Sequence, residues 1–121
     1  MAVDDPDPPA PDDAVIEAID EVASAVEENV SDEQDLLLEL ARVRHDKIGG
    51  VPLRETIGET GQPRALVLMS RLVDRLTLGS ARLRRALVTS LVYEGESVTS
   101  IARVFQVTHQ RISSILRRDK D

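Results

Sequence analysis

Apolar residues recur every three or four positions along the first third of the chain, which is the period of one helical face. They stand at Val15, Ile16, Ile19, Val22, Ala23, Val26 and Val30. Asp12 or Asp13 can cap the start of such a helix, because a carboxylate accepts the free N–H groups of a first turn. The pattern predicts a helix over residues 13–29.

A second helix is predicted over residues 31–48. Ser31 followed three residues later by Gln34 is typical of a capping box. A leucine-rich segment follows, and Gly49 and Gly50 are placed to end it. Each of these two helices has an apolar stripe and an acidic outer face. We therefore expect an N-terminal acidic helical hairpin.

The centre of the chain is predicted to be a connector, because Gly58, Gly61 and two prolines interrupt it. It contains one short helical turn, at residues 53–57. Pro63 suits the first turn of a further helix that runs to Leu78.

Five more signals mark the ends of the remaining helices. Gly79 is expected to end the central helix, Ser80 to cap the next one and Gly95 to end it. Ser97 and Thr108 are expected to cap the last two. The expected fold class is all-α, with about six helices and no strand. It combines the acidic hairpin with a C-terminal three-helix unit.

Composition supports this class. Hydrophobic residues make up 41% of the 121 residues but aromatic residues only 2%, so Leu, Val, Ile and Ala must build the core. The chain has no cysteine, which excludes disulfides and thiolate metal sites. No segment has the length and apolarity of a membrane span or the pattern of a signal peptide. We expect a cytoplasmic protein, associated with the nucleoid, that has no membrane partner.

The net charge of −7 is divided unevenly along the chain. Residues 1–60 hold 17 Asp and Glu against 4 Lys and Arg, whereas residues 61–121 hold 5 against 11. Phosphates respond to the charge within about 8 Å at physiological salt, so the acidic total does not exclude nucleic acid. Three regions are predicted: a disordered acidic arm (1–13), a helical dimerisation or partner-binding region (14–78) and a helix-turn-helix DNA-binding domain (79–121).

Residues 98–118 have the apolar spacing of two short crossing helices. Ala102 is small enough for a close crossing, and Val107 is expected to fill the corner after the turn. Ile112, Ile115 and Leu116 are then expected to pack against Ile101 and Phe105. The two isolated aromatic residues, Tyr93 and Phe105, are expected in the core.

The other face of the last helix is polar and has no acidic residue between Thr108 and Arg118. At 100° per residue, Gln110, Ser113, Ser114 and Arg117 point outward when the isoleucines point inward, with Arg111 and Arg118 beside them. His109 lies in the first turn. Gln can pair with adenine and Arg with guanine, and uncompensated arginines attract phosphates.

Basic residues outside the last helix have two interpretations that stay open. Arg103 lies on the first helix of the pair, and Arg82, Arg84 and Arg85 lie on the helix before it. Each can contact phosphates or belong to a solvated face.

The run SVTSIARVFQVTHQRISSILRR resembles the helix-turn-helix of region 4 of bacterial sigma-70-type factors. The resemblance covers about residues 80–118 and implies a three-helix DNA-binding unit whose last helix lies in the major groove. It implies the groove-facing set Thr108, His109, Gln110, Arg111, Ser113 and Ser114. The turn position usually held by Gly is Gln106, and that position tends to need a left-handed backbone. Nothing upstream resembles the other regions of a sigma factor.

The sequence therefore predicts a sequence-specific transcriptional regulator that binds double-stranded DNA, as a homodimer. The alternative is a protein–protein interaction module that uses the acidic N-terminal helices, regulates another transcription factor and does not bind DNA. A purely structural helical pair is the third interpretation of residues 97–118. No catalytic constellation, phosphate-binding Gly loop or metal-spaced cluster is present, so we expect neither enzyme activity nor a cofactor.

Overall fold

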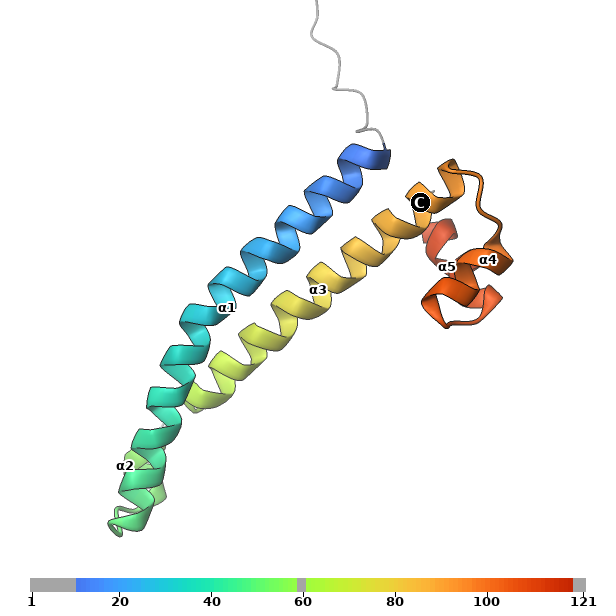
Figure 1. The fold of residues 1–121 in the computed structure, drawn as a ribbon. Helices are drawn as coiled ribbons and strands as arrows, with labels where there is room; N and C mark the ends of the chain where they lie inside the picture. The colour runs from blue at the N-terminus through green and yellow to red at the C-terminus, as the bar shows by residue number, and fades with distance from the viewer. Residues whose placement is uncertain (1–10, 59–60, 119–121) are drawn as a thin grey trace, which may run out of the picture. The chain divides into compact units, whose positions relative to one another are not determined.

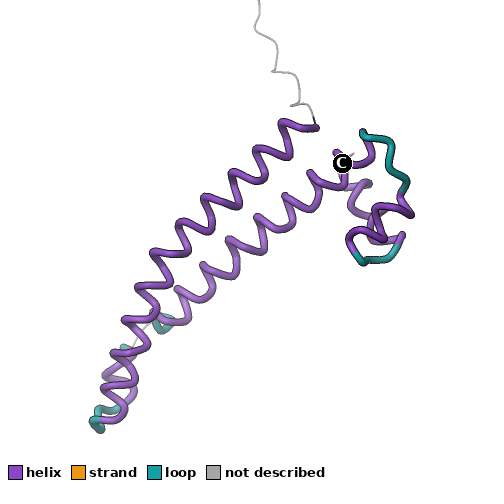
Figure 2. The backbone as a smooth tube through the Cα atoms, viewed as in Figure 1, coloured by secondary structure: helices purple, strands orange, loops and turns teal. Residues whose placement is uncertain are grey.

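A computed structural model describes residues 11–58 and 61–118. This part of the chain is all-helical and has no strand, which confirms the predicted fold class. The predicted arm at residues 1–10 lies outside it. The helices are α1 (Pro11–Ile48), α2 (Leu53–Ile57), α3 (Arg64–Tyr93), α4 (Val98–Phe105) and α5 (His109–Arg118) (Figures 1 and 2).

The expectation of six helices and an N-terminal hairpin is wrong, because α1 is one continuous helix through Ser31. No Gly or Pro lies within the next turn after Ser31, and serine inside a helix costs only about 0.5 kcal/mol. Asn29, two positions before Ser31, and Asp32, directly after it, are both buried. Burying both on one helical face requires the helix to continue, so the capping pattern does not act as an end.

The predicted break between residues 78 and 80 is also wrong. Gly79 lies inside α3 and Ser80 caps nothing. Gly79 is buried, and a Cβ atom placed on it would lie 3.2 Å from Val22 Cγ2. Glycine is thus present where α3 approaches α1 closely, which offsets its cost of about 1 kcal/mol within a helix.

Other predicted helix ends are confirmed. Gly50 follows α1 with φ of 82°, and Gly95 follows α3 with φ of 95°. The short turn at residues 53–57 is α2. The carbonyl of Pro63 accepts the N–H groups of Leu66 and Val67, so α3 begins as expected directly after the proline.

The chain divides into two compact units, which we describe separately. The terminal unit comprises residues 11–22 and 79–118 of the described chain. The middle unit comprises residues 23–78. Helices α1 and α3 each contribute a segment to both units.

In the middle unit, α1 and α3 run antiparallel and are joined by polar contacts. Asn29 Nδ2 donates to the carbonyl oxygen of Leu72 at 3.2 Å. Arg75 Nη1 donates to Asn29 Oδ1 at 3.1 Å and to Asp32 Oδ2 at 2.6 Å. Leu68 is fully buried beside this cluster. These contacts fix which residues of the two helices lie opposite each other.

Helix α2 lies against the end of α1 in the same unit. Arg42 Nη2 donates to the carbonyl oxygen of Thr56 at 2.8 Å, and Thr56 Oγ1 donates to Asp46 Oδ2 at 3.3 Å. Thr56 is buried by these contacts. Among the described residues, no helix combines the length and apolarity that crossing a membrane requires.

Candidate nucleic-acid interface

A small apolar core holds α4 and α5 against α3 in the terminal unit. Val88, Ile101 and Ile112 are fully buried, and Ala102 and Ile115 are nearly so. The four members from α4 and α5 are those predicted from the sequence to pack inward. The core fixes the rotation of α5 about its own axis and thereby decides which of its side chains face solvent.

The packing predicted for four further residues is confirmed for two of them and not for the other two. Phe105 and Leu116 pack against the core and are partly buried, as expected. Val107 is 37% exposed and does not fill the corner. Tyr93 is 76% exposed, so its predicted place in the core is also wrong. It is the last residue of α3, where the helix has already passed the core.

Side-chain caps define the start of α4 and the start of α5. Ser97 Oγ accepts the N–H of Ser100 at 3.1 Å, and Thr108 Oγ1 accepts the N–H of Arg111 at 3.0 Å. Both caps were predicted. Gln106 ends α4 with φ of 56° and ψ of 43°, a left-handed conformation. The expectation that this position needs a left-handed backbone is confirmed.

Most of the predicted site residues on α5 are exposed. Thr108, His109, Gln110, Arg111 and Arg117 face solvent, whereas Ser113 and Ser114 are half-buried. The exposed polar face of α5 is therefore narrower than the face predicted from the sequence, because Ser113 and Ser114 belong to it only in part. Arg118 is the last residue of α5, and its side chain lies outside the described part of the structure.

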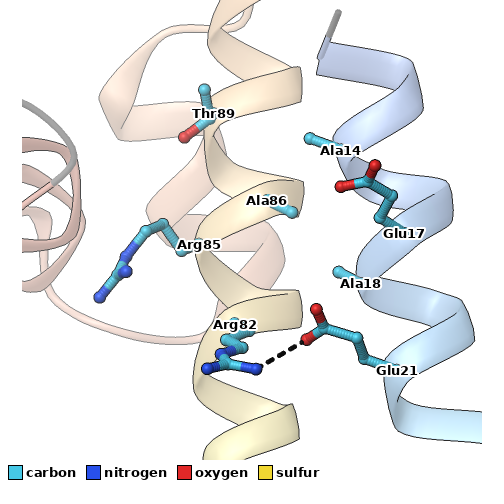
Figure 3. Close-up of a pocket in the computed structure, with 8 residues that line it drawn as sticks. All are labelled: Ala14, Glu17, Ala18, Glu21, Arg82, Arg85, Ala86 and Thr89. Atoms are coloured by element: carbon cyan, nitrogen blue, oxygen red, sulfur yellow. Dashed lines mark hydrogen bonds and ion pairs between the residues drawn. The ribbon is translucent and has the colours of Figure 1, made fainter. Parts of the chain in front are cut away.

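The remaining predicted residues lie on the neighbouring helices. Arg103 is exposed on α4, and Arg85 is half-buried on α3. Figure 3 shows the side chain of Arg85 directed away from α1. Arg85 thus belongs to the side of α3 that faces α5.

Three arginines from two helices line one small hollow. Arg84 and Arg85 of α3 line it together with Arg111 of α5, Ala81 and Ile115. Positive side chains around a hollow favour an anion there. The sequence analysis considered Arg84 for phosphate contact but did not place it beside Arg111, because helical spacing does not show which turns of two helices meet.

Five described arginines of α1 and α3 are paired with carboxylates, whereas Arg44 and Arg54 are not. In the terminal unit, Arg82 Nη1 lies 3.2 Å from Glu21 Oε2. The middle unit pairs the following cations with acids: Arg42, Arg64, Arg71 and Arg75. Among the described residues, Arg103, Arg111 and Arg117 form no ion pair. The cations of α4 and α5 thus remain uncompensated in an acidic chain.

A second hollow, of about 280 Å³, lies between α1 and α3 in the terminal unit (Figure 3). Ala14, Ala18 and Ala86 form its floor because their side chains are short. Arg82 and Glu21 close one end by their ion pair. This hollow is separate from the face of α5.

The described residues contain no group of three His, Cys, Asp or Glu side chains arranged to hold a metal ion. No protein-family model, curated protein or solved structure matches this chain. The site must therefore be interpreted from its own geometry and charge.

Proposed function

We propose that this chain binds double-stranded DNA through α5 and acts as a sequence-specific transcriptional regulator. In this proposal α4, the turn at Gln106 and α5 form a helix-turn-helix, and α3 is the helix that supports it. A single short helix with an exposed polar face fits the width of the major groove, about 12 Å.

The observation that carries the proposal is the uncompensated charge of the α4–α5 surface. Helices α4 and α5 contain no Asp or Glu, and within the described chain their arginines Arg103, Arg111 and Arg117 form no ion pair. Arg44 and Arg54 do not lie against carboxylates either, but five arginines of α1 and α3 do: Arg42, Arg64, Arg71, Arg75 and Arg82. A surface selected only for solubility more often mixes both signs. A phosphate-facing surface instead needs cations without nearby acids, because each neutralised phosphate releases a counterion.

The proposed residues divide into two groups by position. The exposed face of α5 holds His109, Gln110 and Arg117, which would reach base edges. Thr108, Ser113 and Ser114 have shorter side chains and would also contact base edges. Arginines of α3, α4 and α5 would contact phosphates and fix the orientation of the helix. This second group comprises Arg84, Arg85, Arg103 and Arg111, and Arg118 is added to it from the sequence alone.

Two copies of the chain would act together. One reading helix contacts only a few base pairs, so specific binding generally needs two helices on a two-fold related site. We therefore propose a homodimer as the DNA-binding form. A regulator that binds DNA in this way would associate with the nucleoid.

The experiment is a salt titration of binding to a fluorescent duplex, measured by anisotropy between 25 and 200 mM salt. The logarithm of the association constant should fall steeply with the logarithm of salt concentration. Replacing both Arg103 and Arg111 with Ala should reduce the magnitude of that slope by about 1.8, since each phosphate contact contributes about 0.9.

Arg64→Ala supplies the matched control. It also removes one exposed arginine, but one that already lies 3.9 Å from Asp35 in the middle unit. The slope should not change with Arg64→Ala. Absence of duplex binding at 25 mM salt would refute the proposal and favour the second candidate, a protein–protein interaction module built on the acidic surface of α1.

A further inference from the structure

In the middle unit, the α1–α3 pair has one side crossed by ion pairs. Glu28 Oε2 lies 3.2 Å from Arg75 Nε. Asp32 Oδ1 lies 4.0 Å from Arg71 Nη1, and Asp35 Oδ2 lies 3.9 Å from Arg64 Nη2. The charges on this side are thus matched between the two helices, and they need no further partner.

The opposite side of the pair is apolar and exposed. Its residues are between 46% and 68% exposed: Val26, Val30, Leu37 and Leu40 on α1, and Leu66, Met69, Val73 and Leu76 on α3. Three of them directly follow a residue that contacts the other long helix: Val30 follows Asn29, Val73 follows Leu72 and Leu76 follows Arg75. One position is a turn of 100°. Because α1 and α3 are antiparallel, this turn brings both sets to the same side of the pair.

We infer that a second copy of this chain covers the apolar side, so that two α1–α3 pairs pack as a four-helix bundle. The inference deepens the proposed function, because the bundle joins the two reading helices that a two-fold DNA site requires. It rests on contacts in the middle unit and not on the DNA-binding face.

The area of the apolar side suits a dimer interface. A fully exposed aliphatic side chain presents roughly 60–120 Å² of apolar surface, so eight half-exposed ones present about 250–500 Å². A standard interface buries about 800 Å² on each partner, and in homodimers about two-thirds of it is apolar. Side-chain stems at the margins of the patch supply the remaining area.

The apolar side carries almost no charge. The positions of α3 within it are uncharged, and the three arginines of α3 in this unit lie in the ion pairs of the opposite side. On α1 the one charged residue within the set is Glu33, which is exposed and stands between Val30 and Leu37. The apolar side of a second copy therefore matches this side in character, and contact between the two copies places only one charged residue of each, Glu33, at the interface.

The test is sedimentation equilibrium of the full chain without DNA, from 1 to 100 μM. We expect twice the 13.3 kDa mass of one chain and a melting temperature that rises with protein concentration. Val73→Glu should shift the mass to that of one chain, or raise the dissociation constant at least 100-fold. Ser31→Glu adds the same charge at an exposed position outside the apolar side and should leave the mass unchanged.

Two results would overturn the inference. One is a single-chain mass up to 100 μM with a concentration-independent melting temperature. The other is a dimer that Val73→Glu does not weaken. The melting measurement needs no substitution, so the inference stays testable even if Val73→Glu fails to fold. Failure of DNA binding is distinguishable, since a dimer that binds no duplex refutes only the proposed function.

Discussion

Gly79 of α3 lies against Val22 of α1, and a methyl group added to the glycine would stand 3.2 Å from Val22 Cγ2. The contact joins the two long helices within the terminal unit, which also carries α4 and α5. Gly79 therefore has a packing role in the unit that holds the proposed DNA-binding face, despite lying far from that face in sequence.

Gly79→Leu should lower the free energy of unfolding by about 1–3 kcal/mol, because an added side chain overpacks a close helix crossing. Urea denaturation at one fixed protein concentration measures this change. Ser80→Leu introduces the same side chain at the next, exposed position and should alter stability by less than about 0.5 kcal/mol. Equal effects of the two substitutions would show that the close contact does not exist.

Arg75→Leu should destabilise the chain by about 2–3 kcal/mol. It leaves the Asp32 side chain, which is only 13% exposed, without the donor at 2.6 Å and with Arg71 at 4.0 Å as its one remaining cation in the described chain. A buried carboxylate that loses its hydrogen-bonded partner is costly. Replacing both Asp32 and Arg75 with Leu should recover much of the loss. A double-mutant cycle by urea denaturation measures this, and additive losses would contradict the pairing.

Gln106→Gly should raise the melting temperature, with a gain of up to about 1 kcal/mol, because glycine tolerates the left-handed conformation at this turn. Gln106→Val should lower it, since a β-branched residue fits that conformation poorly. Circular dichroism melting of the three proteins gives the comparison. A stability order with Gly lowest would be inconsistent with φ of 56° at this residue.

Thr108→Ala should cost about 1 kcal/mol, because it removes the side-chain acceptor for the N–H of Arg111 at the start of α5. Thr108→Ser keeps the hydroxyl and should retain most of the stability. Thermal melting detects the difference. If Ala and Ser melted at the same temperature, the hydroxyl would not be capping the helix.

The sequence was sufficient to predict the helix ends that depend on local chemistry. Ser97 and Thr108 cap by their own hydroxyls, and Gly50 and Gly95 adopt positive φ. The ends predicted at Ser31 and Gly79 failed for a different reason. There, residues more than 40 positions apart decide the outcome, as Asn29 meets Leu72 and Gly79 meets Val22.

In the candidate site, too, the features set by local sequence could be predicted and those set by contacts between distant residues could not. Local periodicity was enough to predict that Ile112 and Ile115 point inward and that Gln110 and Arg117 face solvent. It could not predict that Ser113 and Ser114 are half-buried, or that Arg84 reaches the hollow beside Arg111. Those features depend on how α3 packs against α5, which a single sequence does not specify.

Selection of bound fragments from a random duplex library tests the central claim, that α5 reads DNA sequence, most directly. We predict enrichment of one motif with two half-sites about 10 base pairs apart, or a multiple of that distance. Gln110→Ala protein, selected in parallel, should lose the preference at one base pair of each half-site while still binding duplex. Recovery of no fragments, or of fragments that share no motif, would contradict the claim.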